Sequence, residues 1–168
     1  MSKKVIRYNI WETNSSSMHT VTVRRERDIN EYYRPPSDGV ITIQLDEYGW
    51  GGDPCDDFIS KLKYAMSMVL HTEYPGYHDY NEDSVIDQNI LENLDGYKLL
   101  LDAINKHMDC KSIIIKRNNN SYYPYGYIDH QSYENYNSLH DFLDDWSVDA
   151  ERFLFDDGVV VWIDNDNH

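Results

Sequence analysis

Three short polar segments of the chain carry the residue types that bind ligands or catalyse reactions. They are ETNSSSMH at residues 12–19, DHQS at 129–132 and DNDN at 164–167. A serine becomes a nucleophile only when a neighbouring base takes its proton, and histidine often serves as that base. In an extended strand Ser17 and His19 lie on the same face, so this short spacing allows the two side chains to meet.

The same segments also have a structural explanation, and the sequence leaves both open. Serine and asparagine satisfy backbone groups in turns, His19 can pack in the core beside Val21, and a buried hydrogen-bond network uses these same residue types. A catalytic site would be that of a hydrolase or transferase acting on a nucleotide or protein, with His130 as the base and a divalent metal held by carboxylates. Its residues would be Ser15, Ser16, Ser17, His19, Asp129 and His130, with Asp164 and Asp166 on the metal.

Net charge is the strongest signal in the composition. The chain has 15 Lys and Arg against 30 Asp and Glu, which gives a formal charge of −15. The imbalance lies after residue 34, and the last forty residues hold eleven acidic residues and one basic residue, Arg152. A negative field of this size repels phosphate backbones and attracts basic surfaces. We therefore expect no direct binding to nucleic acid, and a partner that is itself a basic, nucleic-acid-binding protein.

The densest acidic stretch predicts where that partner binds. Seven carboxylates fall within seventeen residues on two expected helices, where their spacing resembles that of DNA phosphates, about 3.4 Å apart along a strand. Nearby tyrosines would add apolar contact area. The expected contact residues are Asp141, Asp144, Asp145, Asp149, Glu151, Asp156 and Asp157, with Tyr122, Tyr123 and Tyr125.

Hydrophobic periodicity gives the elements that must position these residues. Strands are expected at 3–10, 18–25, 40–45, 112–117, 122–129 and 158–164, the fourth and last of them buried. One helix is expected to begin with Asp53 as its N-cap and to end near His71. A second helical pattern runs from Asp87 to Met108, where Gly96 predicts either a kink or two shorter helices. Ser138 and Ser147 are expected to begin two further short helices, because serine favours the N-cap position.

These elements predict one α+β domain over residues 1–168, with a mostly antiparallel sheet of about five or six strands and helices packed on one face. Cys55 and Cys110 fit no metal or disulfide pattern. The N-terminal segment lacks the long apolar run of a signal peptide, so we expect none, and no apolar run reaches membrane-spanning length. We expect a cytoplasmic protein with no cofactor and no membrane contact, while the oligomeric state stays open.

Parts of this sequence resemble a known group of proteins. WETNSSSMHTVTV, GYIDHQS and FLF followed by VVVWIDNDN resemble segments of an uncharacterised family from phages and mobile elements of Firmicutes-type bacteria. The similarity covers about a quarter of the chain and implies that setting, with the bacterial host cell as the location. It implies no catalytic role, because no activity of the family carries over.

Together these features favour a non-enzymatic counter-defence protein and leave the enzymatic alternative open. Its acidic face would occupy the nucleic-acid groove of a host defence protein, such as a CRISPR effector or a restriction enzyme. That would make it an anti-CRISPR or anti-restriction inhibitor and a DNA mimic. Charge attractions of this kind weaken as salt is added.

Overall fold

The computed structural model describes residues 17–23, 33–49, 51–77 and 85–165, and for Ser17–Thr20, Val23, His130, Gln131, Asp164 and Asn165 it describes the backbone alone. The expected strand at 3–10 lies outside these residues. The strands are β1 (Ser17–Val23), β2 (Val40–Ile43), β3 (Glu47–Tyr48), β4 (Ser112–Ile115), β5 (Tyr127–Ile128) and β6 (Val159–Asn165). The helices are α1 (Phe58–Glu73), α2 (Gln88–Leu91), α3 (Asp95–Asn105), α4 (His130–Tyr133), α5 (Leu139–Asp145) and α6 (Ala150–Phe155).

The chain is a mixed α+β domain, but its described strands do not form the single, mostly antiparallel sheet that the sequence predicts. Its described strands form three two-stranded ladders: β1 with β6, β2 with β4, and β3 with β5. Only the first ladder is antiparallel, and the other two are parallel. The helices between β3 and β4 cross over and return the chain in its original direction, which is the connection that a parallel pair requires.

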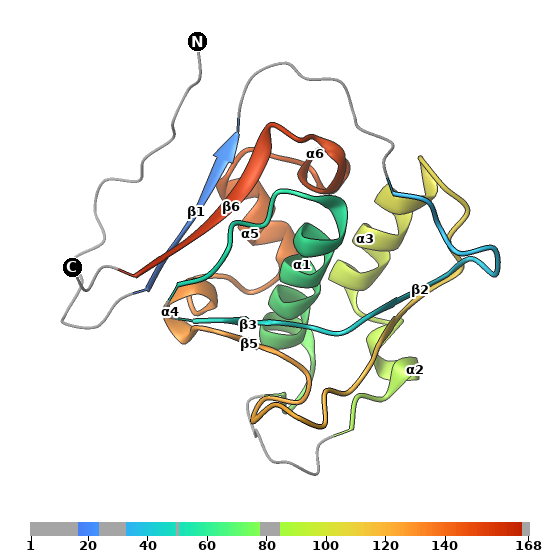
Figure 1. Ribbon diagram of the computed structural model, residues 1–168, viewed down its shortest axis with the longest axis horizontal. Coiled ribbons are helices and arrows are strands. Elements are labelled where there is room, and N and C mark those ends of the chain that lie inside the picture. Colours follow the sequence, from blue (N-terminus) through green and yellow to red (C-terminus); the bar gives the residue numbers. More distant parts are fainter. Residues whose placement is uncertain (1–16, 24–32, 50, 78–84, 166–168) are drawn as a thin grey trace.

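The two parallel ladders form one interrupted ribbon. β2 and β3 follow each other along one extended segment, whereas a loop at residues 117–126 separates β4 from β5 (Figure 1). Lys116 donates its backbone N–H to Ile43 before this loop, and Tyr127 donates to Asp46 after it. After β4 the chain therefore stops pairing with the segment that carries β2 and β3, forms the loop, and resumes pairing with that segment as β5, close to where the pairing stopped.

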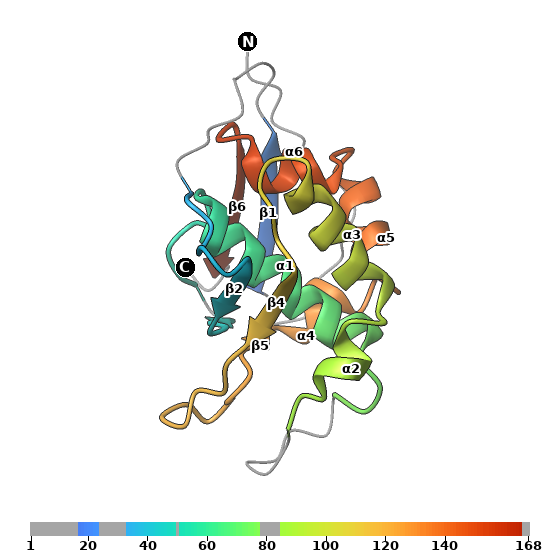
Figure 2. The same ribbon diagram turned by 90° about the vertical axis from the view of Figure 1, so that its right-hand side faces the viewer.

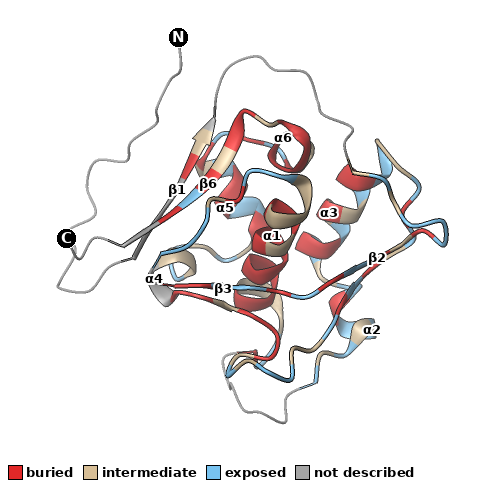
Figure 3. Cartoon of the chain, in the orientation of Figure 1, coloured by how far each residue is buried: buried red, intermediate tan, exposed pale blue. Residues whose placement is uncertain are grey.

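Helix α1 is the centre of the core (Figures 1 and 3). Ten of its sixteen residues are buried, on all sides of the helix, as expected of a helix surrounded by protein. It packs against α3, α4, α5, α6 and β5. Its N-cap is Asp57 and not the expected Asp53, because the Asp57 carboxylate accepts hydrogen bonds from the backbone N–H groups of Ile59 and Ser60.

The second helical pattern is two helices, with the break before Gly96 and not at it. Leu94, the N-cap of α3, makes no side-chain capping bond. Glu73, from the last turn of α1, replaces such a bond: its carboxylate accepts the N–H of Gly96 at 2.8 Å and that of Leu139, the first residue of α5, at 3.0 Å. One side chain therefore caps two helices.

The remaining sequence expectations are met in part. Ser138 caps α5 as expected, but Asp149 and not Ser147 caps α6, and Ser147 has a positive φ of 54°. Strands β4 and β6 are not buried on both faces, since Ile114 and Trp162 are exposed. Buried residues alternate with more exposed ones along both strands, so only one face of each ladder packs on the core. No described helix is both long and apolar enough to cross a membrane.

A buried lysine joins α1 to the turn between α6 and β6. Lys61 is 1% exposed, and its ammonium donates hydrogen bonds to the backbone carbonyls of Asp156 at 2.8 Å and Val159 at 3.4 Å. Burial removes water from the charged form and so lowers the pKa of Lys61 to about 8. The two hydrogen bonds of the ammonium therefore offset only part of the free energy that it costs to remove this charge from water.

This lysine predicts a distinctive pH dependence. Above pH 8 the folded protein releases the Lys61 proton while the unfolded chain keeps it, so the free energy of unfolding rises with pH. Between pH 7 and 9.5 the rise relative to the Lys61→Met variant should be about 2 kcal/mol. Urea unfolding of both proteins across that range measures it. A constant difference between them would contradict the shift.

Candidate functional site

The backbone brings the described parts of the three polar segments together. Strands β1 and β6 pair so that Ser17 lies opposite Asn165, Met18 opposite Asp164 and His19 opposite Ile163. Helix α4, which begins at His130, packs against β1. The antiparallel β1–β6 ladder forms a second ribbon, and Figures 1 and 2 show α4 beside the end of this β1–β6 ribbon where β1 begins. Glu12, Ser15, Ser16 and Asp166 lie outside the described residues.

The register divides these positions between two faces of the ribbon. Residues directly opposite each other in an antiparallel pair share a face. Ser17 and His19 therefore occupy the face of Ile163 and of the buried Val21 and Val161, and Asp164 falls on the other face. Positions 17 and 19 therefore lie on one face of the β1–β6 ribbon, and position 164 lies on the opposite face.

Asp129 and His71 are two titratable side chains that the structure describes beside this region. Asp129 is buried, its N–H bonds the carbonyl of Tyr48, and its carboxylate accepts the hydroxyl of Tyr127 at 3.4 Å. The His71 Nδ1 donates to the Ser67 carbonyl at 2.7 Å, and its Nε2 accepts the Ile128 N–H at 3.4 Å. Because a backbone N–H can only donate and a carbonyl only accept, His71 is the neutral tautomer that joins α1 to β5.

Metal and thiol chemistry find little support in the described part of the chain. Within it no three His, Cys, Asp or Glu side chains gather closely enough to hold a metal ion. Burial raises the pKa of the Cys55 thiol to about 12 and also raises that of Cys110. Thiols shielded in this way stay protonated and are poor nucleophiles.

The seven carboxylates between Asp141 and Asp157 do not form one exposed row. Asp141, Asp144 and Asp149 are exposed. Asp145 accepts the Tyr136 hydroxyl at 2.7 Å, and Glu151 pairs with Lys106 and His107, each at 2.8 Å. Asp156 is buried against Arg152, and Asp157 is partly buried. Three of the seven are therefore exposed to a partner, although each also accepts a hydrogen bond or pairs with a neighbour: Asp141 with the Asn137 N–H, Asp144 with His140 and Asp149 with the Arg152 N–H.

The three tyrosines lie away from these helices. Figures 1 and 2 show the 117–126 loop at the end of the molecule opposite α6. Tyr122 is exposed, Tyr123 stacks on Tyr127 with ring centroids 4.5 Å apart, and Tyr125 is buried. Tyrosines and carboxylates thus occupy separate surfaces instead of the single interface that the sequence suggested.

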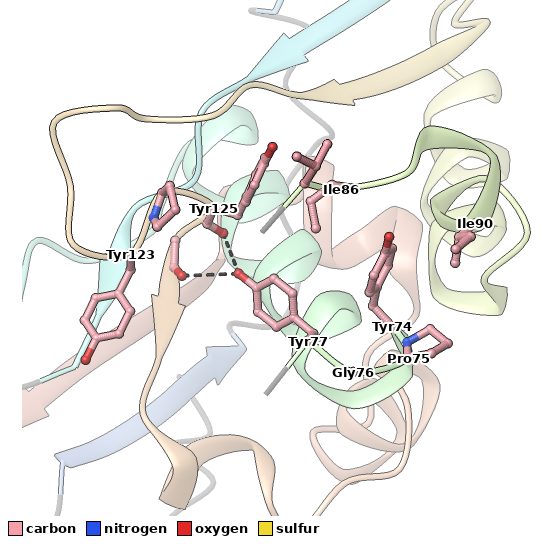
Figure 4. Close-up of a pocket in the computed structure, with 11 residues that line it drawn as sticks. Tyr74, Pro75, Gly76, Tyr77, Ile86, Ile90, Tyr123 and Tyr125 are labelled. Carbon is pink, nitrogen blue, oxygen red and sulfur yellow. Dashed lines mark hydrogen bonds between the residues drawn. The ribbon is translucent and has the colours of Figure 1, made fainter. Parts of the chain in front are cut away.

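Two tyrosine–proline turns form a groove of about 290 Å³ at this end (Figure 4). Tyr74–Tyr77 is one turn, closed by the Tyr77 N–H on the Tyr74 carbonyl, and Tyr123–Gly126 is the other. The Tyr77 hydroxyl reaches the carbonyls of Tyr125 and Gly126 at 2.8 and 3.3 Å and holds the turns together. Val85, Ile86 and Ile90 complete the apolar lining.

Sequence reasoning found two of the groove residues, Tyr123 and Tyr125, and missed the rest. YPGY at 74–77 reads as an ordinary turn, and nothing in it shows that YPYG at 123–126 lies across from it. Val85 is 74% exposed and Ile90 41% exposed. Adjoining exposed apolar residues beside a groove are typical of a contact surface for another protein.

The groove gives a direct prediction. If it contacts a partner, Val85→Asp should weaken binding about tenfold, the effect of losing one apolar contact of about 1.4 kcal/mol. Ile114→Asp, at an exposed position on β4 outside the groove lining, is the matched control and should leave binding unchanged. If the two variants lowered the amount of bound partner protein equally, the groove would be excluded as the contact surface.

Comparisons of this chain with protein-family models, curated protein sequences and solved structures find no match.

Proposed function

We propose that this protein is a non-enzymatic interaction protein whose acidic surface binds a basic partner protein. One observation carries the proposal: fifteen Asp and Glu side chains of the described residues are exposed, against five Lys and Arg. A folded surface with this excess attracts a basic partner over a distance and aligns it before contact.

The partner that this charge fits best is a protein that binds nucleic acid. Such proteins present Lys and Arg to phosphate, and carboxylates on a rigid surface can take the place of phosphates. Asp141, Asp144 and Asp149 supply exposed charge from α5 and the start of α6. The resemblance to a phage and mobile-element family suggests a host defence protein, such as a CRISPR effector or a restriction enzyme, as the target of inhibition.

The test neutralises charge without disturbing the fold. Asp141→Asn, Asp144→Asn and Asp149→Asn are combined, since asparagine caps a helix about as well as aspartate. Glu92→Gln, Asp95→Asn and Asp102→Asn form the control with the same loss of charge, since all three are exposed, Glu92 just after α2 and the other two on α3. The α5–α6 variant should lower affinity about tenfold, as three partly screened contacts of about 0.5 kcal/mol each would do.

The readout is capture of bacterial proteins on the immobilised chain, with washes at about 0.15 M and 0.5 M salt to span increasing charge screening. A retained nucleic-acid-binding protein should be released at high salt, and the free chain should compete with DNA for it. Equal capture by the two triple variants would reject α5–α6 as the contact surface. Capture that survives high salt, or an absence of competition with DNA, would reject the acidic mechanism.

A further inference from the structure

A second cavity, of about 360 Å³, lies where the start of α1 meets the end of α6. It is distinct from the tyrosine groove and shares no residue with it. Aromatic rings and carboxylates dominate its lining. The rings are those of Tyr33, Phe58 and Phe155, and the carboxylates are those of Asp56, Asp57 and Asp157.

The aromatic side of the cavity is firmly held. The Tyr33 and Phe58 ring centroids are 4.6 Å apart, and those of Phe58 and Phe155 are 5.0 Å apart in a stacked arrangement. Phe155 is buried, and its ring continues the column onto His107 at 4.2 Å. Because Phe58 lies between Tyr33 and Phe155, the ring faces inside this column are covered, and a flat group would meet the open end of the column at Tyr33 and the ring edges. Rings that are already held in place need little reordering, which favours binding.

The charge of the cavity is negative. Among the described residues that line it, Lys61 is the one basic side chain, and its ammonium is hydrogen-bonded to the carbonyls of Asp156 and Val159. Three carboxylates line the same space. The Asp57 carboxylate is bound to the α1 N-terminus, while Asp56 is exposed at the cavity. A guest therefore meets aromatic surface and an excess of negative charge.

We propose that this cavity receives an arginine side chain of the basic partner. A guanidinium is planar, stacks on aromatic rings and forms forked hydrogen bonds with carboxylates, whereas the compact, strongly hydrated lysine ammonium does so less well. A cavity of this size is at the small end of ligand sites, which suits one side chain. The inference rests on the proposed function, because it names how the acidic surface recognises one residue of its partner.

The experiment uses small probes and the intact chain. Isotope-labelled protein is titrated with N-acetyl-arginine amide, with the lysine counterpart, and with the citrulline counterpart, a neutral isostere of arginine. The backbone amide signals of residues 58–61 and 154–157 report on the cavity. Asp56→Asn is compared with Asp53→Asn, an exposed neighbour that does not line the cavity.

The arginine probe should shift these signals saturably, citrulline should not, and lysine should bind more weakly. Asp56→Asn should weaken arginine binding up to about fivefold, as loss of one partly exposed charge contact would, and Asp53→Asn should not. Absence of saturable shifts, equal shifts with citrulline, or equal loss in both variants would overturn the site. Arginine binding without any salt-sensitive capture would instead reject the proposed function and leave the site standing.

Discussion

Replacing Gly126 with alanine should destabilise the protein by about 3 kcal/mol or more, the sum of a left-handed backbone and an overpacked contact. Gly126 has a φ of +80°, a region that non-glycine residues rarely adopt. A Cβ there would lie 2.6 Å from the Cβ of Leu45 and 2.9 Å from the carbonyl oxygen of Asp46. Both neighbours belong to the extended segment that joins β2 to β3, so relief would require backbone movement. Urea unfolding gives the difference in stability.

Gly76 provides the matched control on the other side of the groove. It has a φ of +72°, but no atom of the described residues lies within 4 Å of where its Cβ would be. Gly76→Ala should therefore cost only the backbone strain, about 1 kcal/mol. Similar losses in the two variants would show that the close approach of Gly126 to Leu45 does not constrain the fold.

Replacing Glu73 with alanine should cost about 3 kcal/mol, because each hydrogen bond to a charged group contributes roughly 1.5 kcal/mol or more. The substitution removes the acceptor that caps both α3 and α5, leaving the N–H groups of Gly96 and Leu139 without it. Glu73→Gln keeps one acceptor oxygen and should lose about half as much. Thermal and urea unfolding of the two variants would reveal this graded response.

Glu92→Ala is the control for charge and helix composition. Glu92 is exposed at the end of α2, and its carboxylate accepts one bond from the Gln88 side chain. Its removal should change stability by no more than about 0.5 kcal/mol. A comparable loss for Glu73→Ala and Glu92→Ala would mean that the shared cap contributes nothing specific.

Local signals in the sequence were sufficient for several elements. Apolar spacing from Phe58 to Val69 located α1, and Ser138 marked the start of α5, because both depend on residues close together in the chain. The α1 cap was misplaced because DPCDD offers several aspartates, and only the path of the backbone decides that Asp57 is the one used.

Strand pairing could not be read in the same way. Each apolar run was visible, but parallel and antiparallel partners use the same residue types. The direction of β4 follows from the helices before it, and Ile114 is exposed because it lies on the face of the β2–β4 ladder that does not pack on the core. The role of Glu73 could not be predicted either, because it depends on the N-termini of α3 and α5, which are distant in sequence and lie beside Glu73 only in the folded chain.

Among the candidate surfaces, too, the sequence predicted what depends on composition and missed what depends on contacts between distant segments. Charge counting predicted an acidic exterior, which depends on composition alone, but it could not separate the exposed Asp144 from the buried Asp156. The groove and the cavity each combine segments that are distant in sequence, such as Tyr74 with Tyr125 and Tyr33 with Phe155. Only the folded chain brings such residues to one place.

The β1–β6 ribbon also restricts when the protein can fold during synthesis. Strand β1 is among the first described segments to be made, yet its partner, β6, is among the last. Cys55, just before α1, exchanges backbone hydrogen bonds with Val161 of the same late strand. Contacts between such distant segments slow folding, so on the ribosome a nascent chain stopped before residue 159 should lack this ribbon and remain open to chaperones.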